Sequence, residues 1–455
     1  MFIGREKELE FLTNQLKSTA KTAVLVYGKR RIGKSTLIEE AAKQYDGIVI
    51  NHLCAQTTYQ GNLDLLCDSI CMTMGLPTMH FSQLRDIFYF LGTLGRKVLV
   101  ILDEYQYLKQ SGKAGEIDSL MQNVVDNLPS NVKLILCGSY ITVMRELLNE
   151  SNPLFGRFTG IIHLQEMDYY DASLFQPEVL IRQKLENYAV FGGSPYVQSI
   201  LNPESSVREN VIRLLLPQTG ILRTYIENVM LREIGKVYDI RILESIGNHR
   251  LRYSEINGSL HLKSSGLLDK QLKALIDMET ISKVSPVNKP DDKKKQFYEI
   301  TDNLMRFYFS YLFGKTAAIT NLGEEAYYDS YIAPSLTEFI SRRFEQIAIQ
   351  YFRRLSRIGK LQGILNFGTL WYDDPVHKKN GEFDCVLLRQ NGYDFYECKF
   401  YQSPMKLSEC EAEEKQILSI PNITCHDIGF VCSSGFDFHD DRYKLISGED
   451  LFHVK

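Results

Sequence analysis

The sequence has no long apolar run, no CxxC pair and no large net charge, and each absence narrows the class of protein. No stretch of the 455 residues approaches the roughly 18 consecutive apolar residues that a membrane span needs. The opening "MFIGREKELEFL" turns polar at once, unlike a secretory signal, so we expect a cytoplasmic protein with no membrane partner. A net charge of -4 gives no overall attraction to nucleic acid, so any such binding would have to be local.

The nine cysteines lack the paired spacing of common zinc and redox motifs. Cys67 and Cys71 lie one helical turn apart in "LLCDSICM" and could share a metal, but free cysteines are more often buried thiols. Hydrophobic residues make up 44% of the chain and charged residues 24%, which is the balance of a folded globular protein. At roughly 150 residues per domain, the length predicts about three domains.

The strongest motif lies in "TAVLVYGKRRIGKSTLIEEAAK", which predicts a buried strand, a glycine-bounded loop and a helix. Its loop satisfies GxxxxGK[ST], the P-loop in which backbone N–H groups and a helix N-terminus converge on nucleotide phosphates. Lys34 would neutralise phosphate charge and Ser35 would hold Mg²⁺. The helix would bury Leu37, Ile38 and Ala41 on one face. The predicted ATP-binding loop comprises Gly28, Lys29, Arg30, Arg31, Ile32, Gly33, Lys34, Ser35 and Thr36.

An acidic pair follows a second buried strand, in "KVLVILDEYQYL". Asp103 would lie at the carboxyl end of this strand, where open α/β sheets bind their ligands. We expect Asp103 to contact Mg²⁺ through water and Glu104 to act as the general base on the attacking water. The structural alternative is an Asp that caps a helix, followed by a Glu in its first turn.

Two further polar residues come later in the same region. Ser139 ends the buried strand "VKLILCGS" and could reach the γ-phosphate or the water. Arg157 follows a glycine in "SNPLFGRFTGIIHL", and its permanent positive charge suits the charge that develops on a phosphoryl group. An arginine in a surface loop can also simply be solvated.

The order of the P-loop, the "ILDE" strand, the "GS" strand and "PLFGR" resembles the archaeal-type ATPases of the AAA+/STAND group. The resemblance extends over nearly the whole chain and implies a P-loop NTPase fold with a parallel sheet. It implies that Gly4 and Arg5 of "FIGREKELEFL" begin a segment packed near the adenine. It also implies that Gly193 and Pro195 of "FGGSPYV" begin a lid helix beside the nucleotide. Arg157 would act either within its own subunit or across to a neighbour in a homo-oligomer.

The chain is divided into residues 1–165 as the P-loop ATPase core, 166–236 as a helical lid and connector, 237–318 as a winged helix and 319–455 as a nuclease-like domain. In the third segment, a helix with Leu268, Leu272 and Leu275 on one face precedes "ISKVSPV", a polar turn and "FYEI", as in a helix-turn-helix with a β-wing. The lysines of this module could contact DNA, but acidic residues lie among them. The module is therefore either a DNA-binding module or a spacer between domains. The basic and polar residues are Lys263, Ser265, Lys270, Lys273, Lys293, Lys294 and Lys295, and the acidic ones are Asp269, Asp277, Asp291 and Asp292.

The last segment begins with an amphipathic helix, "PSLTEFISRRFEQIAIQYFRRL", followed by three candidate strands, a helix and a strand. This αβββαβ order resembles the core of restriction-endonuclease-like folds. In "DFYECKFYQ" the alternation of a strand places Glu397 and Lys399 on one face and Tyr396, Cys398 and Phe400 on the other.

The resemblance implies that Asp384 and Glu397 hold a divalent metal, Mg²⁺ or Mn²⁺, that Lys399 positions the attacking water, and that Glu345 completes the site. Phe383 replaces the proline that often precedes the Asp. Glu397 and Lys399 could also form a plain ion pair in a domain that has kept the fold and lost the activity. Three hypotheses follow: an ATP-regulated enzyme that processes nucleic acid, an ATP-driven switch with an inactive nuclease-like domain, and a nucleotide-binding protein whose C-terminal modules are scaffolding.

Overall fold

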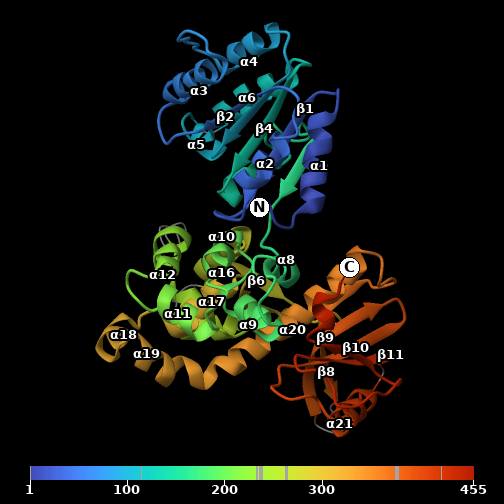
Figure 1. Cartoon of the computed structure of the whole chain (residues 1–455). Coiled ribbons are helices and arrows are strands. Elements are labelled where there is room, and N and C mark those ends of the chain that lie inside the picture. The colour runs from blue at the N-terminus through green and yellow to red at the C-terminus, as the bar shows by residue number, and fades with distance from the viewer. Residues whose placement is uncertain are drawn as a thin grey trace. The chain divides into compact units, whose positions relative to one another are not determined.

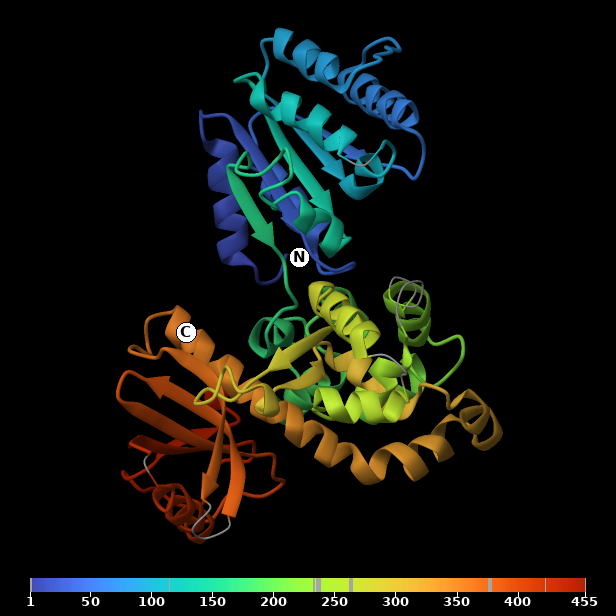
Figure 2. The same cartoon turned by 180° about the vertical axis from the view of Figure 1, so that it is seen from behind.

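The computed structural model describes residues 2–113, 115–231, 234, 239–261, 265–374, 379–421 and 423–454. The chain divides into two compact units, Met1–Glu166 and Met167–Lys455. Figures 1 and 2 show their elements from opposite sides. In the part of the chain that the structure describes, no helix is both long and apolar enough to cross a membrane.

The first unit is built on a five-stranded parallel sheet with the strand order β2-β3-β4-β1-β5. Its central strands are buried along almost their whole length, because their sequences are continuous apolar runs. The predicted α/β class and parallel sheet are therefore confirmed. The strands are β1 (Thr22–Tyr27), β2 (Ile48–Leu53), β3 (Val98–Asp103), β4 (Val132–Gly138) and β5 (Gly160–His163).

Helices cover both faces of this sheet, and alternate strand residues feed two separate cores. One core includes Leu37, Ile38 and Ala41, so the predicted buried face of the P-loop helix is confirmed. The helices are α1 (Glu6–Lys17), α2 (Lys34–Ala42), α3 (Tyr59–Met74), α4 (Leu84–Thr93), α5 (Tyr105–Lys109), α6 (Glu116–Asp126) and α7 (Ile141–Glu146).

The second unit begins with a helical region, as predicted from its lack of strand patterns. It contains α8 (Tyr169–Ser173), α9 (Ile181–Phe191), α10 (Pro195–Ile200), α11 (Val207–Leu214), α12 (Ile221–Tyr225) and a π-helical turn η1 (Ile226–Met230). Three helices and a hairpin follow: α14 (Arg241–Ile246), α15 (Tyr253–Leu260), α16 (Ser265–Asp277), β6 (Ile281–Val284) and β7 (Phe297–Ile300), with a 3₁₀ turn η2 (Lys293–Lys295) between the strands. Leu268, Leu272 and Leu275 are buried together as predicted, whereas Lys263 and the side chain of Ser265 lie outside the described residues.

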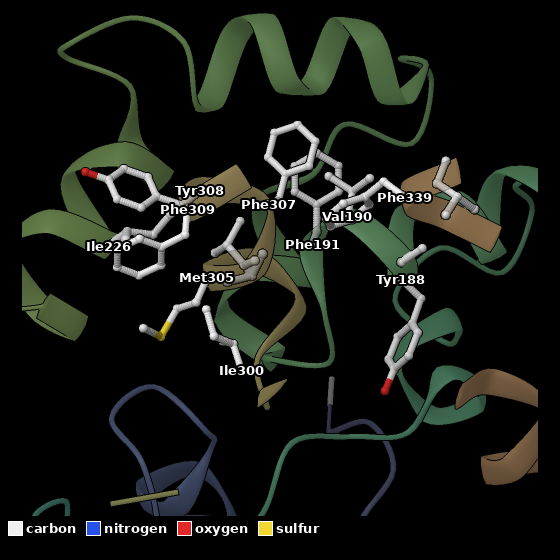
Figure 3. Close-up of a cluster of buried hydrophobic side chains, with 14 of the residues drawn as sticks. Tyr188, Val190, Phe191, Ile226, Ile300, Met305, Phe307, Tyr308, Phe309 and Phe339 are labelled. Carbon is white, nitrogen blue, oxygen red and sulfur yellow. The ribbon is translucent and has the colours of Figure 1, made fainter. Parts of the chain in front are cut away.

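An aromatic core joins these helices to the next ones. Val190 and Phe191 of α9 lie close to Phe307 of α17 (Asn303–Tyr311) and Phe339 of the long helix α20 (Ala333–Arg357) (Figure 3). The rings of Phe307 and Phe339 meet edge to face, with centroids 5.6 Å apart. Between α17 and α20 lie α18 (Thr316–Leu322), α19 (Glu324–Tyr327) and a π-helical turn η3 (Tyr328–Ile332).

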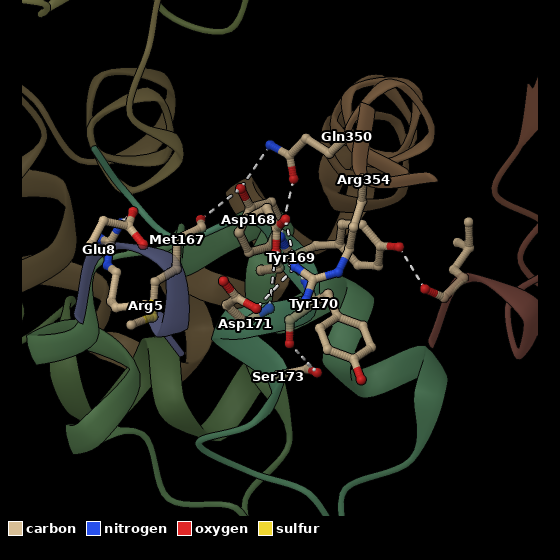
Figure 4. Close-up of polar contacts among 12 residues, drawn as sticks. Arg5, Glu8, Met167, Asp168, Tyr169, Tyr170, Asp171, Ser173, Gln350 and Arg354 are labelled. Atoms are coloured by element: carbon tan, nitrogen blue, oxygen red, sulfur yellow. Dashed lines mark hydrogen bonds and ion pairs between the residues drawn. The ribbon is translucent and has the colours of Figure 1, made fainter. Parts of the chain in front are cut away.

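Polar contacts also attach the start of the second unit to α20 (Figure 4). Arg354 lies 3.0 Å from Asp168 and 2.9 Å from Asp171, at the N-terminus of α8. Gln350 accepts a hydrogen bond from the Tyr169 backbone N–H at 3.1 Å. Helix α20 is therefore held by the residues that immediately follow the boundary between the two units.

The C-terminal sheet has the order β12-β11-β10-β9-β8, antiparallel from β8 to β10 and parallel from β10 to β12. Helix α20 packs on one face, against Tyr396, Cys398 and Phe400, and α21 (Leu407–Leu418) packs on the other. The predicted αβββαβ order is confirmed, with β12 as an additional edge strand. The strands are β8 (Asn366–Asp374), β9 (Lys379–Arg389), β10 (Gly392–Lys399), β11 (Cys425–Cys432) and β12 (Lys444–Ser447), followed by the 3₁₀ turn η4 (Asp450–Phe452).

Candidate functional site

The P-loop runs from the end of β1 to the start of α2, as the motif predicts. Lys34 donates hydrogen bonds from Nζ to the backbone carbonyls of Gly28 and Lys29, at 3.0 and 2.8 Å. Burial lowers the pKa of this lysine. A side chain at position 28 would collide with the Leu164 carbonyl, 2.3 Å from an added Cβ, and Gly33 has a φ of +92°. Both motif glycines are therefore required by the path of the backbone.

Ser35, in the first turn of α2, meets Asp103 at the carboxyl end of β3. The Ser35 hydroxyl donates to Asp103 Oδ2 at 2.9 Å, and Asp103 Oδ1 accepts from the backbone N–H of Glu104 at 2.8 Å. A hydroxyl and a carboxylate are oxygen ligands of the kind that Mg²⁺ prefers. Within the described ranges, no three His, Cys, Asp or Glu side chains gather closely enough to hold a metal ion. An ion at this site would therefore rely on phosphate and water oxygens as well.

Glu104 adopts a left-handed backbone conformation, with φ +52° and ψ +40°, directly after β3. Its Oε2 accepts hydrogen bonds from Ser139 Oγ, at 2.6 Å, and from Gln106 Nε2. The structure thus brings Ser139 to Glu104, because β3 and β4 pair side by side, and its predicted reach to the γ-phosphate or the water stays a prediction. The sequence reasoning missed Gln106, a fully buried amide at the second position of α5, because in sequence it looks like one more residue of a short helix.

The remaining residues of the predicted nucleotide site lie in both units. In the first unit, Arg30 donates to the Tyr107 hydroxyl at 3.0 Å, and Arg5, which follows Gly4 in a left-handed turn, donates to the Gln165 carbonyl. Ile32 of the P-loop is buried in the core, Lys29 and Arg31 flank Arg30, and Thr36 lies in the first turn of α2. In the second unit, the Gly193 carbonyl accepts from Met167 N–H at 3.0 Å, and Pro195 is the first residue of α10. The helix start is confirmed, and its place beside the nucleotide stays a prediction.

Arg157 lies near the amino-terminal end of β1, whereas the P-loop follows its carboxyl end. It pairs with Asp126 at 2.9 Å, and the Asp126 carbonyl accepts from Lys21, which precedes β1. The P-loop follows the far end of β1, a distance of about 20 Å for a strand of this length. Within one chain, the structure therefore does not bring Arg157 to Lys34.

The four predicted residues of the C-terminal site come from three elements. Burial and repulsion from Asp384 raise the pKa of Glu345, on α20, to about 8. Burial and repulsion from Glu397 raise the pKa of Asp384, on β9, to about 6. Burial also raises the pKa of Glu397, on β10. Asp384 and Glu397 adjoin the paired residues Cys385 and Tyr396 of two neighbouring strands, and the effect of Asp384 on Glu345 places α20 beside them. Within the described residues, these carboxylates do not gather closely enough to hold a metal ion as a set of three, so an ion here would also need phosphate or water oxygens.

Lys399 adds the positive charge of this cluster. Its Nζ lies 2.8 Å from Glu397 Oε1 and 3.3 Å from Glu413 of α21. Burial disfavours the charge of this lysine, but the two carboxylates outweigh that effect and raise its pKa. The ion pair between Glu397 and Lys399, which is the structural alternative, is therefore present. A plain ion pair would not need Glu345 and Asp384 nearby.

Asp384 lies in a β-bulge. Gly368 of β8 pairs with Val386 and Leu370 pairs with Phe383, so Thr369 alone faces the two residues Asp384 and Cys385. Bulges re-aim side chains and are common beside active sites.

The segment between β6 and β7, which we call the wing, docks on the free edge of β8. Val287 N–H donates to the Thr369 carbonyl at 2.7 Å. Asn288 donates to the Trp371 carbonyl at 2.7 Å and accepts from the Trp371 N–H at 3.2 Å. Lys295 lies over the Trp371 ring, 3.7 Å from its centroid, so one of the predicted DNA-contacting lysines is engaged within the chain.

A buried charge network next to the wing was also missed. Glu299 of β7 pairs with Arg250 at 3.1 Å and with Arg306 at 3.2 Å, and Arg250 reaches Glu382, two residues before Asp384, at 3.3 Å. Burial opposes the charge of Glu299, but Arg306, Arg250 and Arg343 outweigh it and lower its pKa to about 2. No local motif marks these residues, since they meet only after folding.

Comparisons with known proteins also find an ATPase domain in the part of the chain that contains the P-loop. Residues 2–197 match a family described as an ATPase domain predominantly from Archaea, and residues 308–415 match a family described as archaea bacterial proteins of unknown function. The chain is 28% identical over 400 residues to an uncharacterized protein of Methanocaldococcus jannaschii, covering 86% of this chain and 85% of the relative. It is also 40% identical over 40 residues to an uncharacterized ATP-binding protein of the same organism, covering 9% of this chain and 68% of that protein.

Similar solved structures include a Walker-type ATPase of Pyrococcus abyssi, with 21% identity, a TM-score of 0.46 and coverage of 68% of this chain and 96% of that one. The ORC2 protein of Aeropyrum pernix, in ADPNP–ADP complexes, has 16% identity, a TM-score of 0.43 and coverage of 67% and 92%. The P-loop geometry and the family match concern the same part of the chain: residues 2–197 carry an ATPase domain of the family found predominantly in Archaea.

Proposed function

We propose that the protein hydrolyses ATP with Mg²⁺ and uses the nucleotide cycle to control a metal-dependent site in its C-terminal sheet that cleaves nucleic acid. The hydrogen bond between Ser35 and Asp103 carries the first half, because it brings two separate motifs to one point. The position of Asp384 and Glu397 on adjacent strands, beside Lys399 and near Glu345, supports the second half.

At the ATP site, each role follows from a contact in the structure. Lys34 now donates to carbonyls of its own loop, and it exchanges them for phosphate oxygens when ATP binds. Ser35 and Asp103 are the residues that would hold Mg²⁺, which supplies charge neutralisation on the phosphates. Glu104 accepts the proton of the attacking water, and Ser139 lies beside it to orient that water or the γ-phosphate.

At the C-terminal site, buried carboxylates that repel one another suit a cation. Asp384 and Glu397 are the residues that would hold a divalent ion, which supplies an acidified water and screens the phosphate. Lys399 orients the water, and Glu345 borders the same group. The α14–α16 helices with the β6–β7 hairpin support a winged helix, whose exposed Lys270, Lys273, Lys293 and Lys294 are left to contact DNA.

The second candidate is an ATP-driven switch whose nuclease-like domain binds DNA or a protein without cutting. Two observations favour it: Lys399 is paired directly with Glu397, and the wing is bound to β8 instead of being held out for DNA. This candidate requires binding or assembly that depends on nucleotide, without cleavage that depends on metal.

Cleavage assays with the full chain separate the two candidates. The protein is incubated with labelled single- and double-stranded DNA and with RNA, with Mg²⁺ or Mn²⁺, and with or without ATP. We expect cleavage that Asp384→Ala and Lys399→Ala each reduce by about 10²-fold or more. Lys34→Ala should abolish ATP hydrolysis and remove the ATP dependence of cleavage.

Asp441→Ala is the matched control, because this carboxylate of the same domain is 99% exposed and pairs only with His439 among the ion pairs of the described residues. If both Asp384→Ala and Lys399→Ala still cleave like the parent, these residues do not form the cleavage site. Nucleotide-dependent DNA binding with no cleavage at any metal concentration would establish the switch instead.

A further inference from the structure

Gln106 is held in one orientation by its neighbours. Its Oε1 accepts a hydrogen bond from the Ser139 backbone N–H at 3.3 Å, so its Nε2 must face the opposite way, toward Ser139 Oγ at 3.2 Å and Glu104 Oε2. The side chain is fully buried. An added Cβ at Gly138 would lie 2.6 Å from Gln106 Oε1, so the end of β4 leaves just enough room for this amide.

The donors in this group all lead to one oxygen of Glu104. Gln106 Nε2 donates to Ser139 Oγ, which donates in turn to Glu104 Oε2, and Gln106 also donates to Oε2 directly. The described hydrogen bonds to this carboxylate all end on Oε2. A carboxylate fixed through one oxygen by two donors presents its other oxygen, Oε1, in a defined direction.

We propose that Gln106 is a positioning residue for ATP hydrolysis, which aims Glu104 Oε1 at the attacking water and holds Ser139 beside it. The proposal rests on the role of Glu104 as general base. Gln106 touches neither nucleotide nor water itself; it acts through the angle of the carboxylate. Such a residue changes the rate of the chemical step and leaves nucleotide binding intact.

The test is a double-mutant cycle on the full-length protein, with steady-state ATPase assays and titration of a fluorescent ADP analogue. Gln106→Met keeps the length and removes both amide groups. We expect kcat to fall by about 10²-fold, as for a misplaced catalytic group, with KM and the affinity for the analogue within about twofold of the parent. Gln106→Asn, a shorter amide, should lose less activity than Gln106→Met.

The cycle separates positioning from a structural role. In a Glu104→Ala background, adding Gln106→Met should cause no further loss of kcat, because the residue acts only through Glu104. Gln110→Met is the matched control, since this glutamine is exposed one helical turn further on, and it should hydrolyse ATP like the parent.

Equal losses of kcat in the two backgrounds, a kcat of Gln106→Met equal to the parent, or a parallel loss of nucleotide affinity would each overturn the proposal. If Gln106→Met does not fold, as judged by its thermal unfolding, the same cycle is run with Gln106→Asn and the same criteria apply. A Glu104→Ala protein that hydrolyses ATP at the parental rate would instead overturn the base assignment, and the positioning role with it. The two failures are distinguishable, because only the second appears in the single Glu104 variant.

Discussion

Glu345 lies where its negative charge costs free energy. Burial and the neighbouring Asp384 raise its pKa from 4.5 to about 8, although Arg250 and Arg343 act in the opposite direction. A carboxyl group with a raised pKa binds its proton more tightly in the folded state than in the unfolded state. Its stabilising effect is therefore complete below the unfolded pKa and is lost as the pH rises through the folded pKa.

Glu345→Gln should remove this pH dependence, because a neutral amide imitates the protonated carboxyl. We expect the variant to be more stable than the parent at pH about 8, by a free energy of unfolding on the order of a few kcal/mol, and similar to it near pH 4.5. Urea unfolding of both proteins across this pH range, without divalent metal, measures the difference. Glu338→Gln on the exposed side of the same helix serves as the control and should show no such trend. If the difference in free energy of unfolding between variant and parent is the same at every pH, the surroundings do not raise the pKa of Glu345.

Residues in local motifs could be predicted from sequence, and residues that depend on distant contacts could not. Lys34, Ser35 and Asp103 follow from a loop and a strand end whose geometry is set over a few neighbours, and parallel pairing then brings them together. Gln106 and Glu299 are also held by hydrogen bonds, but these partners lie 33 and 49 residues away in sequence, at Ser139 and Arg250. No pattern in one chain signals such pairs.

At the level of elements, the wing and β8 behave as one structure. β8 is the last strand of its sheet, and an unpaired edge exposes backbone groups that must be covered or kept wet. Val287 and Asn288 form hydrogen bonds with backbone groups of Thr369 and Trp371 on this edge. Thr369 faces the bulge that carries Asp384, and Trp371 lies two residues further along the strand. The position of the wing thus bears on the geometry of the C-terminal site.

Asn288→Ala should free this edge without unfolding the sheet. It removes two hydrogen bonds to Trp371, worth about 1–2 kcal/mol together. We expect faster hydrogen exchange of the amides of residues 286–296 and 366–374, with β10 and β11 unchanged. Lys294→Ala, an exposed change on the same wing, is the control. Unaltered exchange at β8 in Asn288→Ala would show that the wing does not stabilise this edge.

The elements that sequence reasoning found are those with one clear period or a continuous apolar run. β3, β4 and β10 and the stripe of α20 were all visible in this way. β12 was missed because its four residues, "KLIS", are too short to show a period and pair only with β11. Tertiary pairing defines such a strand, and its own sequence does not.

At the level of the whole molecule, Arg157 poses the question of subunit number. Its pairing with Asp126 lies at the amino-terminal end of β1, opposite the P-loop, so it cannot complete the ATP site of its own chain in this conformation of the first unit. A second copy could present this same end of its sheet, with Arg157, to the P-loop of the first. The alternative is that Arg157 only stabilises the turn after α6 through its ion pair.

Mixing two inactive variants decides between these roles. Arg157→Ala keeps an intact P-loop, and Lys34→Ala keeps an intact Arg157, so a mixed oligomer contains sites with one complete set of residues. If Arg157 acts between subunits, we expect the mixture to recover part of the parental ATPase rate, while each variant alone stays at least about 10³-fold slower. Mixing either variant with the double variant should recover no activity, because one of the two residues is then missing from every subunit. Sedimentation with ATP establishes that mixed oligomers form. If mixed oligomers form and no activity returns, Arg157 is structural. The same follows if Arg157→Ala alone hydrolyses ATP and is only less stable, because a catalytic arginine is required for hydrolysis.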